Sequence, residues 1–337
     1  MNIVEVKQNW PKGYMRIDVS LGNVCNYKCW YCWPGSNEGT YKWPEFDLLV
    51  KNISHVLDYY IKHTDKRKFD FNLLGGEITH WKRFIDFIKY FKERYDCIFT
   101  LTTNASKKLE WWEEAAPYLD YVGISSHHQF CDPIHIRNVA DLLYKKNVLV
   151  VVKVLMDPFE WNKCLDHVEI YKESKYRWTI RYLEIIDNER VSYNEEQKNL
   201  MAKLRARSPN IFWFLKNNKS YVSKVSVVDS FGKTHKIKDH QIVLDRMNNF
   251  KGWECDVGVD WIAFKIDGSV SGICGNSLYA SNEILNINDI DFSEKFHPEI
   301  KSTICNQDAC WCLFETNMNK RKISTTLNKK IIPIHAN

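Results

Sequence analysis

Two hydrophobic periods alternate along the first half of the chain. Between residues 15 and 21 apolar and polar residues alternate, which is typical of a half-buried strand. Between residues 46 and 61 apolar residues recur every three or four positions, which is typical of an amphipathic helix. Strand-like and helix-like segments continue to alternate as far as residue 186. The predicted strands are 69–73, 97–103, 121–126, 148–156 and 178–186, and the predicted helices are 84–91, 109–119, 134–146 and 160–174.

This order predicts six β/α units, because each strand is followed by a helix before the next strand. Such alternation is typical of an α/β fold with a parallel sheet. Six units are fewer than the eight of a closed TIM barrel. We expect a core domain over 1–207, a bridge over 208–250 with a hairpin near 221–237, a smaller C-terminal α+β domain over 251–320, and a tail over 321–337.

Composition narrows the class of protein. The 337 residues can form two domains, and no run of about 18 apolar residues predicts a membrane span. The formal net charge of +5 is too small to indicate nucleic-acid binding by itself. The first residues lack the features of a signal peptide, and the chain has 11 cysteines. We therefore expect a cytoplasmic protein that uses cysteines as metal ligands rather than in disulfides.

Three cysteines near the start carry the clearest chemical signal. Cys25, Cys29 and Cys32 form a C-x3-C-x2-C run directly after the first predicted strand. Three thiolates can hold three irons of a [4Fe–4S] cluster and leave the fourth iron open for a small molecule. The alternatives are a zinc site or thiols without a ligand. Zinc usually has four ligands, and no His or Cys close in sequence completes this set.

The run resembles the signature of the radical S-adenosylmethionine (SAM) superfamily, C-x3-C-x-aromatic-C, with Tyr31 at the aromatic position. The resemblance implies that the open iron binds the amino and carboxylate groups of SAM. It also implies that an electron from the cluster cleaves SAM to a 5′-deoxyadenosyl radical, which abstracts a hydrogen atom from the substrate. The family's usual core, a partial (β/α)6 TIM-like barrel, agrees with the six predicted units.

Two further strand ends resemble SAM-binding elements of this superfamily. Gly75, Gly76 and Glu77 resemble its GGE motif, which contacts the SAM amino group, and glycines permit a close backbone approach. A plain turn at the strand end is the alternative. Asn104 lies in a Thr-Thr-Asn sequence similar to a Thr-Asn-Gly element near SAM, with Ala105 where glycine is common.

The later strands supply the remaining candidates. The resemblance implies that Ser125 and Ser126 bind the SAM carboxylate or ribose, and that His127 and His128 face the substrate as acid or base groups. Lys153 and Arg181 interrupt apolar strands, so they either line the interior or form structural pairs. We include Lys153 among the cofactor-binding candidates and Arg181, which could clamp a carboxylate or phosphate, among the catalytic ones.

A second group of cysteines lies in the C-terminal third. Asp267 and Gly268 between two strand-like runs indicate a hairpin. The segment resembles the twitch and SPASM extensions of radical SAM enzymes, which carry auxiliary iron–sulfur clusters. The resemblance implies an auxiliary [4Fe–4S] cluster with four ligands from five candidates, with zinc as the alternative. The candidates are Cys255, Cys274, Cys305, Cys310 and Cys312.

These features together predict a radical SAM enzyme. Its expected substrate is a peptide or a small polar metabolite, which is oxidised or rearranged with the help of the auxiliary cluster, and its expected electron donor is a flavodoxin or ferredoxin. A second hypothesis is modification of a nucleoside or nucleic acid. A third, from another class, is a non-catalytic iron–sulfur or zinc-binding protein.

Overall fold

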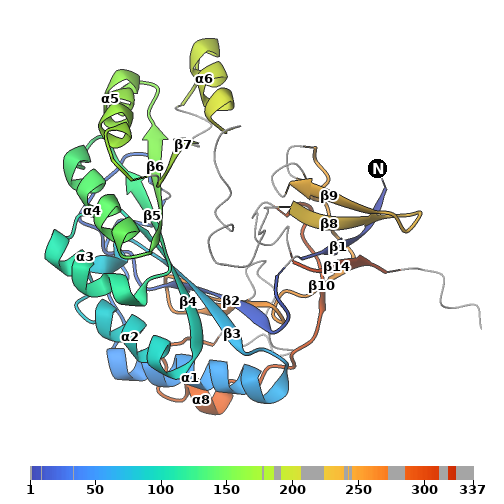
Figure 1. Ribbon diagram of the computed structural model, residues 1–337. Coiled ribbons are helices and arrows are strands. Elements are labelled where there is room, and N and C mark those ends of the chain that lie inside the picture. Colours follow the sequence, from blue (N-terminus) through green and yellow to red (C-terminus); the bar gives the residue numbers. More distant parts are fainter. Residues whose placement is uncertain are drawn as a thin grey trace, which may run out of the picture. The chain divides into compact units, whose positions relative to one another are not determined.

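The computed structural model describes residues 2–8, 10–32, 34–176, 178–185, 191–205, 224–238, 242, 245–271, 285–310 and 318–323 (Figure 1). The chain divides into two compact units. The first, here called the α/β unit, comprises residues 11–222 and 261–299. The second, the β-rich unit, comprises residues 1–10, 223–260 and 300–337.

The α/β unit is built on an eight-stranded sheet with the order β12-β11-β2-β3-β4-β5-β6-β7. Neighbouring strands from β2 to β7 are all parallel, which confirms the predicted parallel sheet. The partial (β/α)6 TIM-like barrel stays a prediction. The strands are β2 (Tyr14–Ser20), β3 (Lys68–Leu74), β4 (Asp96–Thr103), β5 (Tyr121–Ser126), β6 (Leu149–Met156), β7 (Thr179–Glu184), β11 (Trp261–Phe264) and β12 (Val270–Ser271).

Helices line one face of this sheet (Figure 1). Phe71 of β3 packs on Phe87 and Phe91 of α2, so this face is apolar. Capping fixes where some helices begin: the Glu45 side chain accepts from two backbone N–H groups of α1, and Asp132 caps α4. The helices are α1 (Phe46–His63), α2 (Phe84–Arg94), α3 (Leu109–Ala115), α4 (Pro133–Lys145), α5 (Trp161–Lys172), α6 (Glu195–Arg205) and α8 (Phe292–Lys295), with short 3-10 helices η1 (Ile78–His80) and η2 (Ala116–Tyr118).

The opposite face of the sheet carries a buried polar network. Arg16 donates from Nε to Asp18 at 3.0 Å and from a terminal nitrogen to Asp70 at 2.9 Å. Asn72 donates to the same Asp18 oxygen at 2.8 Å, and Thr100 to Asp70 at 3.2 Å. These buried charges are tolerated because the Arg16 guanidinium is paired with the carboxylates of Asp18 and Asp70. The face away from the helices is thus lined by ionic and polar groups.

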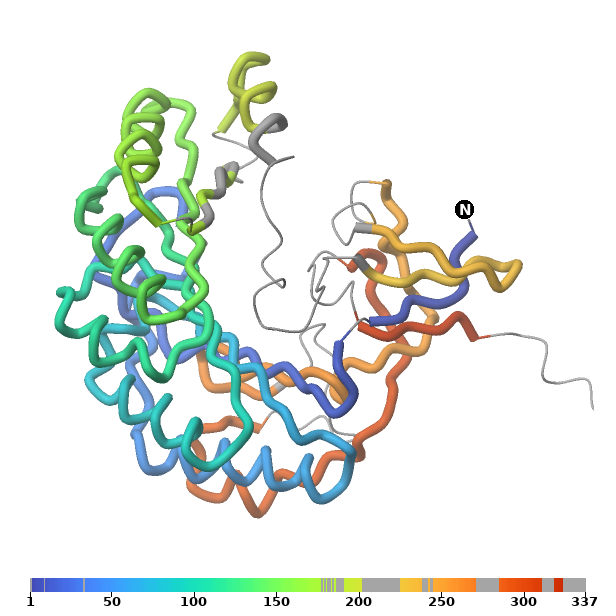
Figure 2. Tube along the Cα trace, viewed as in Figure 1, coloured from blue at the N-terminus to red at the C-terminus, as the bar shows by residue number. Residues whose placement is uncertain are grey.

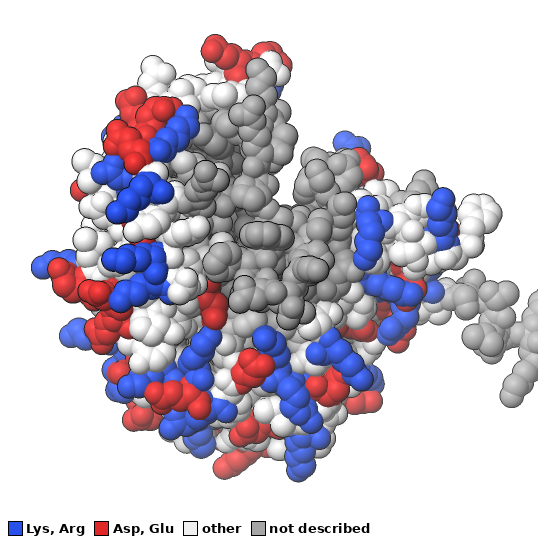
Figure 3. All heavy atoms as spheres, viewed as in Figure 1, with Lys and Arg blue, Asp and Glu red and all other residues white. Residues whose placement is uncertain are grey.

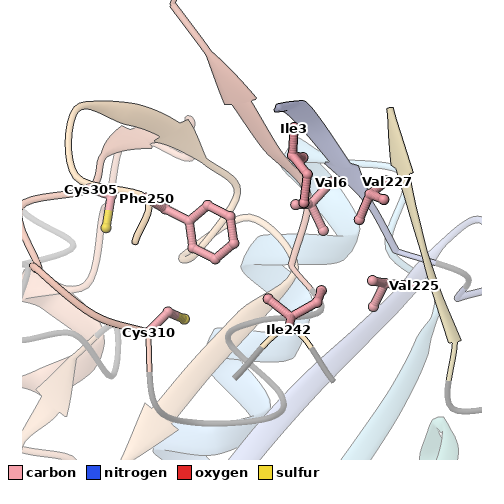
Figure 4. Close-up of a cluster of buried hydrophobic side chains, with 8 residues drawn as sticks. All are labelled: Ile3, Val6, Val225, Val227, Ile242, Phe250, Cys305 and Cys310. Atoms are coloured by element: carbon pink, nitrogen blue, oxygen red, sulfur yellow. The ribbon is translucent and has the colours of Figure 1, made fainter. Parts of the chain in front are cut away.

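The β-rich unit has a six-stranded antiparallel sheet with the order β13-β10-β14-β1-β8-β9. Its strands are β1 (Ile3–Lys7), β8 (Lys224–Asp229), β9 (Thr234–Lys238), β10 (Trp253–Cys255), β13 (Thr303–Ile304) and β14 (Lys320–Lys322). Aliphatic side chains of β1 and β8 form one buried cluster with Phe250, Cys305 and Cys310 (Figure 4).

The units divide the chain differently from the expected domains. The predicted hairpin near 221–237 is present as β8 and β9, but it lies within a sheet rather than in a bridge. The Asp267–Gly268 hairpin belongs to the α/β unit, because β11 pairs in parallel with β2 (Figure 2). The first residues belong to the β-rich unit, because β1 pairs with β8 and β14.

None of the described helices is both long and apolar enough to span a bilayer.

Candidate active site

The cysteine loop begins where β2 ends, at the carboxyl edge of the parallel sheet. Asn23 holds this loop: it is fully buried, its amide group donates to the Gly35 carbonyl at 2.7 Å, and its side-chain oxygen accepts from the Tyr41 N–H at 2.7 Å. The sequence between Asn23 and Tyr41, which contains all three cysteines, is therefore closed at its base.

The three thiols of this loop influence one another. Burial, with smaller effects of Cys32 and Cys25, raises the pKa of Cys29 to about 12. Burial also raises the pKa of Cys25, although the Tyr27 N–H, 3.3 Å from its sulfur, acts in the opposite direction. In the described part of the chain, no three His, Cys, Asp or Glu side chains are arranged to hold a metal ion. The three thiols fit an iron–sulfur cluster, because thiolates ligate iron and all three lie in one loop. Burial and the neighbouring thiols disfavour the thiolate form of each cysteine, and bound iron would stabilise that form.

Gly75 and Gly76 lie directly beneath this loop. The Gly76 N–H donates to the Gly22 carbonyl at 3.2 Å, and the Glu77 N–H donates to the Val24 carbonyl at 2.8 Å. A Cβ atom on Gly76 would lie 2.3 Å from the Val24 oxygen, and Gly75 has a φ of +133°. Both positions therefore require glycine, and the backbone that approaches them closely is that of the cysteine loop.

The Glu77 carboxylate joins the ends of β3 and β4. It is buried; one oxygen accepts from the hydroxyls of Thr79 and Thr103, both at 2.6 Å, and the other accepts from the Asn104 N–H at 2.5 Å. Burial raises the pKa of Glu77, against these hydrogen bonds. Asn104 also donates to Asn26 of the cysteine loop at 2.9 Å. The structure thus brings together the loop, Glu77 and Asn104.

Tyr31 and His127 link the loop to the end of β5. The Tyr31 hydroxyl lies 3.1 Å from His127 Nδ1, and the two rings stack. Burial, with a smaller effect of His128, lowers the pKa of His127 to about 4. His127 is therefore neutral at neutral pH, and can accept or donate a hydrogen bond without carrying charge.

His128 is buried, and its ring also stacks with that of Tyr31. Its Nε2 lies 3.3 Å from a carboxylate oxygen of Asp157, but without the alignment of a hydrogen bond. The Trp30 indole donates to the same Asp157 oxygen at 3.3 Å. Asp157 thus holds both a residue of the cysteine loop and a histidine of the β5 end.

The two serines of β5 point in opposite directions. Ser126 is fully buried and its hydroxyl lies 2.7 Å from the Tyr171 hydroxyl of α5, so it faces the helices. Ser125 pairs in register with Lys153 of β6, whose ammonium lies 3.5 Å from the Thr102 hydroxyl. Arg181 follows Lys153 in register on β7, and its side chain lies outside the described residues.

The C-terminal cysteines fall into two sets. Cys255, Cys305 and Cys310 are buried free thiols of the β-rich unit. Burial raises the pKa of Cys255, which Lys320 lowers and Cys305 raises. Cys274 and Cys312 lie outside the described residues.

Two residues that organise the site were not among the predicted ones. Asn23 precedes the first cysteine by two positions, and Asp157 follows β6. A polar residue directly after a parallel strand is a general signal for a site, and this signal could have indicated Asp157. No comparable signal marks Asn23, because its partners are fixed by the path of the loop.

Residues 19–129 match the family model described as the Radical SAM superfamily. The matched segment contains the three cysteines, the Gly-Gly-Glu sequence, Asn104, and both histidines at the β5 end. No curated protein matches the chain.

Several solved structures are similar at low sequence identity. "Native anSMEcpe with bound AdoMet" is 16% identical, with a TM-score of 0.48 and coverage of 83% of this chain and 80% of that one. "Crystal structure of Streptococcus suis SuiB" is 12% identical, with a TM-score of 0.49 and coverage of 85% and 66%. "Crystal structure of methylornithine synthase (PylB)" is 8% identical, with a TM-score of 0.35 and coverage of 51% and 54%.

Proposed function

We propose that this chain is a radical SAM enzyme in which Cys25, Cys29 and Cys32 hold a [4Fe–4S] cluster whose open iron binds SAM. The main support for the proposal is that the cysteine loop packs closely against Gly75 and Gly76. This contact lies at the carboxyl edge of the parallel sheet, where α/β folds have their active sites. When bound, the cluster and SAM would supply a 5′-deoxyadenosyl radical that abstracts a hydrogen atom.

The protein's own contribution is to position these groups and to exclude water. The Tyr27 N–H already points at the Cys25 sulfur, and hydrogen bonds to cluster sulfurs are a means of adjusting potential. Ligation requires the thiolate form, so the raised pKa of Cys29 means that cluster binding releases protons.

The polar face of the sheet supports a peptide or a small polar metabolite as substrate. Arg16 and Asp18 of β2, Asn72 of β3 and Lys153 of β6 give this face a charged and polar character. The surface charges do not favour nucleic acid, because Lys and Arg are interspersed with Asp and Glu over the face drawn in Figure 3.

The cysteines of the β-rich unit support an auxiliary [4Fe–4S] cluster. Cys255, Cys305 and Cys310 are three buried thiols in one compact unit, and Cys312, which belongs to the same unit, would complete the set. Such a cluster could accept an electron from a substrate radical and so give net oxidation. A flavodoxin or ferredoxin would supply the electron for SAM cleavage.

Anaerobic reconstitution of the full chain tests the proposal. With SAM and dithionite we expect release of 5′-deoxyadenosine, which disappears when Cys25, Cys29 and Cys32 are all changed to Ala. We expect about eight irons per chain, as two cubane clusters require. An intact cluster without SAM cleavage would indicate a non-catalytic binder. About four irons and one zinc would indicate a zinc site in the β-rich unit.

A further inference from the structure

The second and third cysteines of the loop are the ends of a tight turn. The Cys32 N–H donates to the Cys29 carbonyl at 3.1 Å, which places Trp30 and Tyr31 at the two central positions of the turn. Both cysteines are thus joined directly to an aromatic residue. Whatever holds the two aromatic side chains therefore also fixes the positions of Cys29 and Cys32.

The ends of two neighbouring strands hold these side chains. The Trp30 indole N–H donates to Oδ2 of Asp157, which directly follows β6, at 3.3 Å. The Tyr31 ring stacks with His127, which directly follows β5, at 5.8 Å between ring centres. The turn is therefore attached to the carboxyl ends of both β5 and β6.

Asp157 is the buried acceptor of this attachment. It is 1% exposed, and its Oδ1 accepts from the Phe159 N–H of its own turn at 2.9 Å. His128 Nε2 lies 3.3 Å from Oδ2, but neither ring nitrogen of His128 has a hydrogen-bond partner in the described part of the chain. A buried carboxylate is costly unless donors compensate it. The indole of Trp30 is such a donor, and it belongs to the cysteine loop.

The loop has a separate attachment on the other side of Cys29. The Asn104 side chain donates to Asn26 at 2.9 Å, and the Asn104 N–H donates to Glu77 at 2.5 Å. Cys29 therefore lies between a contact to the ends of β3 and β4 through Asn26 and a contact to the end of β6 through Trp30. Two such attachments fix where a cluster on this loop would lie relative to the sheet.

We propose that Asp157 is a positioning residue, which holds the turn from Cys29 to Cys32 through Trp30 and so aligns the open iron with SAM. The inference rests on the proposed function, because that function assigns the cluster and SAM to this site. Misplacing two bound reactants by about 1 Å can cost about 100-fold in rate. The hydrogen bond from Trp30 is present without a cluster, so the apoprotein tests the attachment by itself.

The first measurement uses the full-length apoprotein. In Asp157→Asn the new NH2 group faces the Trp30 N–H in one amide orientation and the Phe159 N–H in the other, so one donor always loses its acceptor. We expect about fivefold faster alkylation of Cys29 by iodoacetamide, measured by peptide mass spectrometry, as the loss of one ordinary hydrogen bond allows. The buried Cys97 near the amino end of β4 is the internal reference and should keep its rate.

Two further variants identify the interaction. Trp30→Phe keeps an aromatic ring, removes the same N–H and changes no charge, so we expect the same acceleration. The double variant should lie within about twofold of either single variant, because both changes remove one hydrogen bond. Glu160→Gln removes an exposed charge close to Asp157 and should change the rate by less than about twofold. If Asp157→Asn does not fold, Trp30→Phe is the test variant.

The second measurement uses the reconstituted protein. Each variant is reduced with dithionite and mixed with SAM in a single turnover, so that electron supply does not limit the rate. We expect Asp157→Asn and Trp30→Phe to keep their iron and to form 5′-deoxyadenosine about 10- to 100-fold more slowly at saturating SAM. Glu160→Gln should stay within about twofold of the unchanged chain.

The outcomes separate the inference from the proposed function. An unchanged chain that binds iron but forms no 5′-deoxyadenosine overturns the proposed function and the inference with it. If the unchanged chain is active, equal alkylation or equal rates in the two single variants overturn only the role of Asp157. So does a double variant with the product of the two single effects, because the residues then act separately. Loss of iron from folded Asp157→Asn also overturns that role, because Asp157 is then needed to assemble the cluster rather than to align it.

Discussion

The Gly76→Ala substitution tests whether the cysteine loop depends on a close backbone approach. The new Cβ atom would lie 2.3 Å from the Val24 carbonyl oxygen, well inside the 3.4–4 Å of ordinary contacts. The obstructing atom belongs to the backbone, so it cannot rotate away. The loop itself must shift, which breaks the hydrogen bond from the Glu77 N–H to Val24 and moves Cys25, the next residue.

The cost follows from three contributions. Overpacking costs about 1–3 kcal/mol. The lost hydrogen bond costs about 1 kcal/mol. The smaller entropy of the unfolded alanine chain returns about 0.4–1 kcal/mol. We therefore expect a net loss of about 1–3.6 kcal/mol in the free energy of unfolding of the apoprotein, measured in urea. We also expect less iron and less 5′-deoxyadenosine after anaerobic reconstitution.

Gly39→Ala is the matched control. This glycine lies in the same loop and has a φ of +79°, but a Cβ atom there would meet nothing within 4 Å. It should cost about 1–2 kcal/mol through backbone conformation alone and retain the iron. The reasoning is refuted if Gly76→Ala keeps full iron and unfolds within about 0.5 kcal/mol of the unchanged chain, the range of a neutral surface substitution.

Three further predictions concern the same site. Asn23→Ala should lower the free energy of unfolding by about 1–3 kcal/mol and reduce iron binding, because it removes the hydrogen bonds to the Gly35 carbonyl and from the Tyr41 N–H, whereas Asn37→Ala in the same loop should change little. Glu77→Gln should cost about 1–3 kcal/mol by thermal unfolding, because in one amide orientation its NH2 group meets the Asn104 N–H and in the other it meets the Thr79 N–H. The pKa of His127 is about 4 in the folded state against 6.5 when unfolded, so the unfolded chain binds more protons between these values. Apoprotein stability should fall as pH drops through this window, and in urea titrations at several pH values His127→Gln should show a smaller fall; an unchanged slope would contradict this.

The sequence predicted the sheet well, because hydrophobic periods are local. Strands β2 to β6 and helices α1 to α5 lie within a few residues of their predicted bounds. The pairing of β11 with β2 could not be predicted in this way, because it joins segments about 245 residues apart and leaves no local signal. The same holds for β1, whose partners β8 and β14 lie far along the chain.

Within the site, residue types were easier to predict than their contacts. Gly75 and Gly76 were predicted to permit a close approach, but the approaching group in the structure is the cysteine loop. Ala105 stands where the related element has glycine, and its φ of +56° shows why glycine is common there. Strand alternation alone could have separated Ser125 from Ser126.

Glu77 shows how one residue can serve the fold and a ligand together. A carboxylate has about four lone-pair positions on its two oxygens. One oxygen of Glu77 accepts from Thr79 and Thr103 and is filled, while the other accepts from the Asn104 N–H. That oxygen therefore keeps a lone pair for a second donor, and an ammonium group is the donor that a buried carboxylate binds best. The expected contact with the SAM amino group is thus compatible with the clamp between β3 and β4, and Glu77→Gln would impair both at once.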